Sequence, residues 1–199
     1  MPDFRTLKEQ GYAQTEIKNS TFIAYASPVN DEREAKEFID LVKSKHNDAN
    51  HNVSAYLINQ NNVLAMKYDD DGEPAGSSGK PVFRVLEMKE LSNVVVVVSR
   101  YFGGIRLGFG GLSRAYREAA VEAIEAAGII EIHERTRIEI SSDYSDMDTV
   151  IKLVEEYSGN ILKTDYADIV NFAVEVDSEH AENFIEKVIN VTRNRVTVK

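Results

Sequence analysis

The stretch Val94-Val95-Val96-Val97-Val98, which runs through Ser99 into Arg100-Tyr101-Phe102-Gly103-Gly104-Ile105-Arg106-Leu107-Gly108-Phe109-Gly110-Gly111, decides the fold. Five consecutive valines show no alternation with polar residues, so they predict a central strand with both faces covered. After the glycines, Leu112–Ala127 is rich in alanine and glutamate and ends before Gly128, which predicts a helix. The stretch therefore indicates a domain in which helices cover a sheet.

Shorter patterns on the N-terminal side of the valine strand predict the rest of this domain. Asp31 and Glu34 resemble a capping box, and the apolar residues that follow at helical spacing predict a helix to about Ser44. Tyr68–Lys80 is acidic and glycine-rich and has little apolar content, so it predicts an exposed loop. The other expected elements are strands at 15–20 and 21–26, a hairpin of 53–58 and 63–67 with its turn at 59–62, and a helix from Pro81 to about Glu90.

The pattern after the long helix predicts a second, smaller domain. Its segments read strand 137–141, helix 143–157, strands 161–166 and 169–176, helix 179–190 and strand 195–198. This βαββαβ order is the ferredoxin-like arrangement. The sequence therefore predicts an α+β protein of two domains, residues 1–134 and 136–199, with the boundary near Glu134–Thr136.

Composition limits the possible chemistry. The 199 residues include no cysteine, which excludes disulfides, thiolate metal sites and thiol nucleophiles. No segment approaches the roughly 20 apolar residues of a membrane span, and the N-terminus lacks the pattern of a signal peptide. We therefore expect a cytoplasmic protein without a membrane partner.

The charge of the chain is unevenly distributed. The formal net charge of −10 argues against a protein that coats nucleic acid in general. Between Lys80 and Arg117, however, seven basic residues face two acidic ones, so this segment carries +5 and the remainder −15. A local basic surface on an acidic protein is therefore expected.

The glycine- and arginine-rich segment from Arg100 to Arg117 predicts an anion site. Glycines allow backbone N–H groups to approach a ligand, and a helix start adds unpaired donors and a partial positive charge. The alternative is that the glycines only form a tight turn while the arginines pair with acids. The residues predicted to bind an anion or nucleic acid are Arg100, Tyr101, Phe102, Gly103, Gly104, Arg106, Gly110, Gly111, Arg114 and Arg117.

A second part of this site is predicted from Asp70, Asp71 and Glu73, together with His51. Carboxylates are most stable beside the local excess of basic charge, so we expect them close to the arginine loop. Alternatively, the acidic segment is a solvated turn or holds a hard cation, and a lone histidine is structural. Because neither an EF-hand, a Walker loop nor a catalytic triad can be assembled, no metal, cofactor or catalytic residue is predicted.

These motifs resemble the YigZ/IMPACT family. The resemblance rests on Asp70-Asp71-Gly72-Glu73-Pro74, Gly76–Pro81 and the long segment from Val94 through Tyr116, and it covers about residues 1–134. It implies an N-terminal domain similar to the second domain of a small-subunit ribosomal protein. It also implies a C-terminal domain similar to a ferredoxin-like domain of elongation factor G. Val53 stands where the family usually has cysteine, which puts any shared thiol chemistry in doubt.

Two classes of function follow from the loop and the resemblance. Eukaryotic relatives act in translational control, so the first expectation is a regulatory binding protein that contacts RNA, the ribosome or a translation factor through the Arg100–Arg117 surface. The rival is an enzyme that acts on a phosphorylated or carboxylated small molecule. The sequence leaves the oligomeric state open.

Overall fold

The computed structural model describes residues 4–60 and 63–199, and the chain forms two compact units, Phe4–Ile132 and His133–Lys199. Both helices and sheets are present in each unit, which confirms the predicted mixed, two-domain fold class. Each helix of the described segments is too short or too polar to cross a lipid bilayer.

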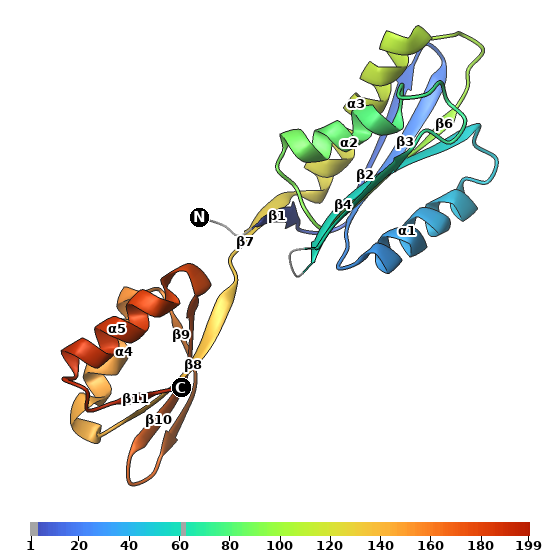
Figure 1. Ribbon diagram of the computed structural model, residues 1–199. Helices are drawn as coiled ribbons and strands as arrows, with labels where there is room; N and C mark the ends of the chain where they lie inside the picture. Colours follow the sequence, from blue (N-terminus) through green and yellow to red (C-terminus); the bar gives the residue numbers. More distant parts are fainter. Residues whose placement is uncertain (1–3, 61–62) are drawn as a thin grey trace. The chain divides into compact units, whose positions relative to one another are not determined.

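The first unit is built on a five-stranded antiparallel sheet with the order β2-β3-β6-β4-β5 (Figure 1). The valine strand is its centre, as predicted: all residues of β6 before Tyr101 are buried. The strands are β2 (Gly11–Ile17), β3 (Ser20–Pro28), β4 (His51–Gln60), β5 (Val63–Asp69) and β6 (Val94–Tyr101).

Helices cover both faces of this sheet, so the first unit has three layers (Figure 1). Val95 and Val97 pack in the core shared with α1 (Glu32–Lys45). Val94, Val96 and Val98 pack in the larger core shared with α2 (Gly79–Met88) and α3 (Gly108–Ala127). The alternation of neighbouring side chains between two apolar cores explains why the strand needs valine at every position.

Capping fixes the start of α1 as predicted. The Asp31 carboxylate accepts the Glu34 backbone N–H at 2.8 Å, and the Glu34 carboxylate accepts the Asn30 backbone N–H at 2.8 Å. The first bond satisfies an N–H group that the first turn of a helix leaves without a partner, and the second ties the residue before the cap to the helix.

Several features of this unit differ from the sequence-based expectations. The strands β1 (Phe4–Leu7) and β7 (Ile129–Ile132) pair as a separate small sheet that was not predicted, because four residues carry too little periodicity. Helix α3 begins at Gly108 rather than Leu112, so Gly110 and Gly111 lie in its first turn. The turn expected at 59–62 lies partly outside the described residues.

The second unit has the predicted ferredoxin-like order. Its antiparallel sheet runs β11-β8-β10-β9, formed by β8 (Arg135–Ser142), β9 (Asn160–Tyr166), β10 (Val170–Asp177) and β11 (Thr197–Val198). The helices α4 (Met147–Glu156) and α5 (Ala181–Val191) are each preceded by a short 3₁₀ turn, η1 (Tyr144–Asp146) and η2 (Ser178–His180). Apolar residues from both helices and the sheet form one core, which includes Phe172 and Phe184.

Candidate functional site

The loop between β5 and α2 is held in place by the Asp70 carboxylate. That carboxylate accepts the backbone N–H groups of Gly76, Ser78 and Gly79 at 2.7–3.1 Å and the Ser78 hydroxyl at 2.7 Å. Burial raises the pKa of Asp70, but these hydrogen bonds outweigh burial and hold the pKa below its usual value. The carboxylate therefore remains charged and fixes the loop in one conformation.

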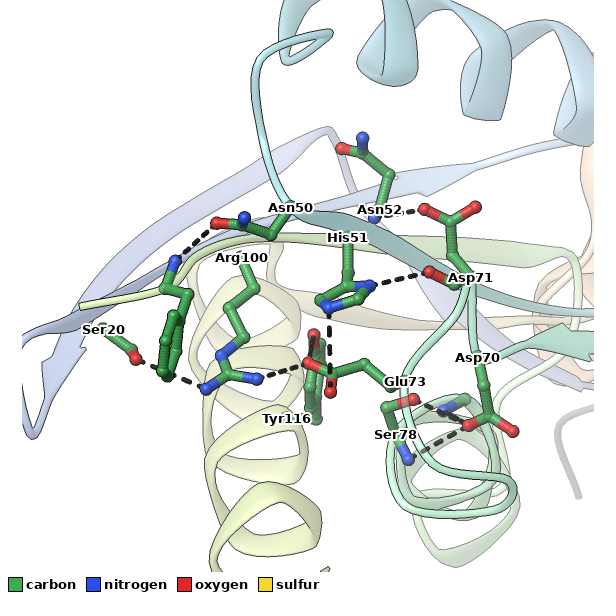
Figure 2. A network of polar contacts seen from close by, with 12 residues as sticks. Ser20, Asn50, His51, Asn52, Asp70, Asp71, Glu73, Ser78, Arg100 and Tyr116 are labelled. Atoms are coloured by element: carbon green, nitrogen blue, oxygen red, sulfur yellow. Dashed lines mark hydrogen bonds and ion pairs between the residues drawn. The ribbon is translucent and has the colours of Figure 1, made fainter. Parts of the chain in front are cut away.

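The sequence-based expectation of an exposed loop at Tyr68–Lys80 is wrong at its centre. Glu73, Ser77 and Ser78 are buried, with exposed fractions of 8% or less. Because the Asp70 carboxylate satisfies so many donors of the loop, the chain folds back on itself and the Glu73 side chain points inward (Figure 2).

Glu73 is the centre of a buried polar cluster. Its Oε1 accepts hydrogen bonds from Arg100 Nη1 at 2.7 Å and from the Tyr116 hydroxyl at 2.8 Å (Figure 2). Burial and the adjacent Glu73 carboxylate raise the pKa of the Tyr116 hydroxyl far above its usual value, so this hydroxyl stays protonated and donates. The expectation that acids of this loop lie beside the arginine segment therefore holds for Glu73 and Arg100.

His51 meets the other oxygen of Glu73. Its Nδ1 lies 2.8 Å from the Asp71 carbonyl oxygen, and its Nε2 lies 3.9 Å from Glu73 Oε2. A carbonyl oxygen only accepts, so Nδ1 carries a proton. The Asp71 carboxylate pairs with Lys43 at 3.1 Å and accepts the Asn52 backbone N–H at 2.7 Å, which ties this loop to β4.

The cluster opens into a cleft of about 420 Å³, which we call the Glu73 cleft. His51, Glu73 and Arg100 lie on one wall, and the start of α3 supplies Leu107, Gly108 and Phe109. The remaining lining residues are Asn50, Pro74, Phe102, Arg106 and Leu112. The cleft thus combines a buried carboxylate, a histidine, two arginines and exposed rings.

A second cleft, of about 490 Å³, lies between α2 and α3 and is here called the basic cleft. Four cationic side chains line it: Lys80, Arg84, Arg114 and Arg117. None of them takes part in an ion pair or a side-chain hydrogen bond within residues 4–60 and 63–199. Its other lining residues are Ala75, Gly76, Pro81, Met88, Phe109 and Ser113. Phe109 lines both clefts and is 60% exposed.

The predicted anion-binding residues divide among several environments. Arg106 lines the Glu73 cleft, whereas Arg114 and Arg117 line the basic cleft, so the arginines do not converge on one point. Arg100 is 5% exposed and neutralises Glu73 inside the domain. The Tyr101 hydroxyl donates to Asp48 at 2.8 Å and lies 2.9 Å from His46, outside both clefts.

The predicted glycines also have different roles. A Cβ on Gly103 would overlap the Asn19 backbone, so Gly103 permits a close approach of two chain segments. Gly104 has a φ of +87° with no atom near its Cβ position, which identifies a conformational requirement of the turn. The predicted hollow of glycine amides is in fact the first turn of α3 at Gly110 and Gly111.

Three lining residues of the basic cleft were not among the residues proposed for the site from sequence: Lys80, Arg84 and Ser113. A signal for the first two was present: Lys80 and Arg84 are four residues apart, a spacing that places them on one face of a helix. The basic cleft forms between faces of α2 and α3. The packing of these two helices against each other is tertiary structure, which the spacing of residues in the sequence does not predict. In the described part of the chain, no three His, Asp or Glu side chains gather in a way that could hold a metal ion.

Comparison with known proteins gives matches along nearly the whole chain. The family model "Impact N-terminal domain" matches residues 18–124, and "Domain of unknown function (DUF1949)" matches residues 140–195. A Bacillus subtilis (strain 168) protein described as IMPACT family member YvyE is 36% identical over 98% of this chain and 89% of that protein. An Escherichia coli (strain K12) protein described as IMPACT family member YigZ is 30% identical over 89% of this chain and 88% of that protein.

Solved structures give matches of two kinds. A crystal structure described as that of a hypothetical protein has 27% identity and a TM-score of 0.64, and the match covers 100% of this chain and 97% of that one. A structure described as that of the two-domain translational regulator Yih1 is 35% identical over 61% of this chain and 47% of that one. Its TM-score is 0.37, which is too low for a comparison of the two folds.

Proposed function

The chain belongs to the IMPACT family, and on that premise we propose that it is a regulatory binding protein linked to translation, which contacts RNA, the ribosome or a translation factor through the basic cleft. Resemblance to this family implies translational control. A cytoplasmic location is part of this proposal.

The observation that carries this proposal is the set of unpaired cations on an acidic protein. The chain has a net charge of −10, yet Lys80, Arg84, Arg114 and Arg117 share one cleft with no ion pair to a carboxylate among residues 4–60 and 63–199. Because these four cations form no ion pairs although the protein is rich in Asp and Glu, they are available to an anionic partner.

The surroundings of the cations favour RNA as the partner. Phe109 is 60% exposed and Met88 is 77% exposed, both at the same cleft. Exposed aromatic rings stack on the bases of single strands, while arginines contact phosphates. A single strand that passes along the cleft would therefore meet a ring and charges together.

The proposal is tested by the double variant Arg114→Ala, Arg117→Ala. Both side chains are exposed on α3, so their loss leaves the core intact. Removal of two phosphate contacts lowers the affinity for a single-stranded RNA by at least about tenfold at low salt. The matched control is Lys8→Ala, Lys67→Ala, which removes the same charge from exposed positions outside both clefts.

Fluorescence anisotropy with a labelled 12-nucleotide RNA measures both variants. Equal affinities for the basic-cleft variant and the control would show that total charge alone matters and would contradict the proposal. If neither RNA nor ribosomes bind to the wild type, a protein partner such as a translation factor becomes the occupant of the basic cleft.

A further inference from the structure

The Glu73 cleft contains two atoms that can accept a hydrogen bond and receive none within the described residues, Glu73 Oε2 and His51 Nε2. Glu73 Oε1 accepts hydrogen bonds from Arg100 and Tyr116, whereas Oε2 accepts none within residues 4–60 and 63–199; His51 Nε2 lies 3.9 Å from it, beyond hydrogen-bond distance. The Glu73 side chain is 4% exposed. Glu73 lines the cleft, so a carboxylate oxygen that accepts no hydrogen bond within the described residues is open to a donor from a ligand.

The second acceptor is the Nε2 atom of His51. Because Nδ1 donates to the Asp71 carbonyl oxygen, Nε2 is the acceptor nitrogen in the neutral form of the ring, and it lies 3.9 Å from Glu73 Oε2 (Figure 2). Two acceptors side by side fit a ligand with two neighbouring hydroxyl groups, which donates one hydrogen to each.

The rest of the cleft is complementary to an anion. Arg106 lines it, is exposed and has no ion pair among the described residues. Gly108 begins α3 at the same wall, and Leu107 before it provides no side-chain cap, so the first N–H groups of the helix remain available. Arginine and helix amides together favour a phosphate group.

Two exposed rings complete the lining. Phe102 is 44% exposed and lies under the Arg100 guanidinium at 5.3 Å, and Phe109 is 60% exposed. Exposed aromatic rings in a cleft with polar groups favour a flat heterocycle that stacks on them. A cleft of about 420 Å³ is within the size range of small-molecule sites.

From these features we infer that the Glu73 cleft binds one ribonucleotide unit, with its ribose diol on Glu73 and His51, its phosphate at Arg106 and its base on the phenylalanines. The unit is a free ribonucleotide or the 3′-terminal residue of an RNA, since both carry the same diol. The inference rests on the proposed function and deepens it, because it names the part of RNA that this cleft recognises.

The test is calorimetric titration of the full chain with AMP and with 2′-deoxy-AMP. We expect AMP to bind at least about tenfold more tightly, because the deoxy ligand leaves one acceptor of the pair without a donor. Arg106→Ala weakens AMP binding about tenfold through the lost phosphate contact. Lys8→Ala leaves it unchanged, because Lys8 lies beside Gly128 at the far end of α3.

His51→Gln and Glu73→Gln test the acceptor pair directly. Each variant lowers the preference for AMP over 2′-deoxy-AMP to less than about threefold. Because Glu73 also neutralises Arg100, the fold of its variant is checked by circular dichroism, and His51→Gln gives the decisive result if that variant unfolds. Equal affinity of the wild type for AMP and 2′-deoxy-AMP, or no binding of either, overturns the inference.

RNA oligomers distinguish the two sources of the ribonucleotide. Tighter binding of an oligomer with a normal 3′ end than of one with a 2′,3′-dideoxy end assigns the cleft to RNA ends. Equal binding of the two, with AMP bound, assigns it to a free ribonucleotide. The dideoxy oligomer lacks the diol, so its binding measures the contacts made by the basic cleft. If it does not bind while AMP binds, the proposed function is contradicted and the inference about the Glu73 cleft still holds.

Discussion

At the scale of single residues, the account depends on the buried pair of Glu73 and Arg100. Both side chains are nearly inaccessible, and the distance between Arg100 Nη1 and Glu73 Oε1 is 2.7 Å. A buried charge that loses its partner is far more costly than an exposed one. This pair therefore holds the acidic loop against β6 and shapes one wall of the Glu73 cleft.

Glu73→Ala is expected to lower the free energy of unfolding by about 3–5 kcal/mol, because Arg100 is left buried without a counterion. The control is Glu37→Ala, which removes an exposed, solvent-screened pair with Arg33 and is expected to cost far less. Urea denaturation followed by circular dichroism measures both. A loss near that of the control would show that Arg100 is solvated in solution.

His46 makes stability depend on pH. The pKa of its imidazole is lowered in the folded chain, mainly by burial and then by the charge of Lys45. The hydroxyls of Tyr25 and Tyr101 each lie 2.9 Å from one of its two ring nitrogens. Asp48 acts weakly in the opposite direction. A folded-state pKa below the unfolded value of about 6.5 means that the unfolded chain binds the proton first.

Stability from His46 is therefore present above about pH 6.5 and is lost as the pH falls through the lower folded-state value. We expect the free energy of unfolding to fall as the pH drops below about 6.5, and His46→Gln to remove part of that slope. Urea denaturation at several pH values measures it. An unchanged slope in the variant would assign the pH dependence to other groups.

At the scale of elements, the turn between β6 and α3 sets the geometry of both clefts. It delivers Arg106 to one cleft and starts the helix that carries Arg114 and Arg117 into the other. Close contact of Gly103 with the Asn19 backbone fixes the beginning of this turn.

Gly103→Ala is expected to destabilise the first unit more than Gly104→Ala does. A Cβ at Gly103 meets backbone atoms of Asn19 that cannot move independently, whereas a Cβ at Gly104 meets no atom within 4 Å. The cost at Gly104 is conformational strain of about 1–2 kcal/mol, because its φ is +87°. Thermal denaturation compares the two, and a more stable Gly103→Ala variant would refute the close contact.

The elements also show how far sequence reasoning reaches. The valine strand, the capped helix α1 and the βαββαβ order of the second unit follow from local periodicity and turn chemistry. The inward turn of Glu73 could not be predicted, because it depends on hydrogen bonds from the loop to Asp70 and on Arg100, which is distant in sequence. The division of the arginines between two clefts depends likewise on how α2 packs against α3.

At the scale of the whole molecule, we propose that the two units fold independently, since each has its own sheet and its own apolar core. A fragment of residues 133–199 is expected to unfold cooperatively on its own. Thermal unfolding followed by circular dichroism measures the fragment and the full chain. A gradual, non-cooperative loss of signal from the fragment would contradict independence and would show that the second unit needs the first.

The salt dependence of RNA binding tests the central claim, that unpaired cations at the two clefts meet phosphates. Five cations, Lys80, Arg84, Arg106, Arg114 and Arg117, neutralise five phosphates if all engage one single strand. The slope of log affinity against log salt is then about −3.5 for the wild type, at about −0.7 per phosphate. Arg114→Ala, Arg117→Ala reduces its magnitude to about 2, while Lys8→Ala, Lys67→Ala leaves it unchanged. A slope near zero for the wild type, or equal slopes for wild type and the Arg114→Ala, Arg117→Ala variant, would contradict the account.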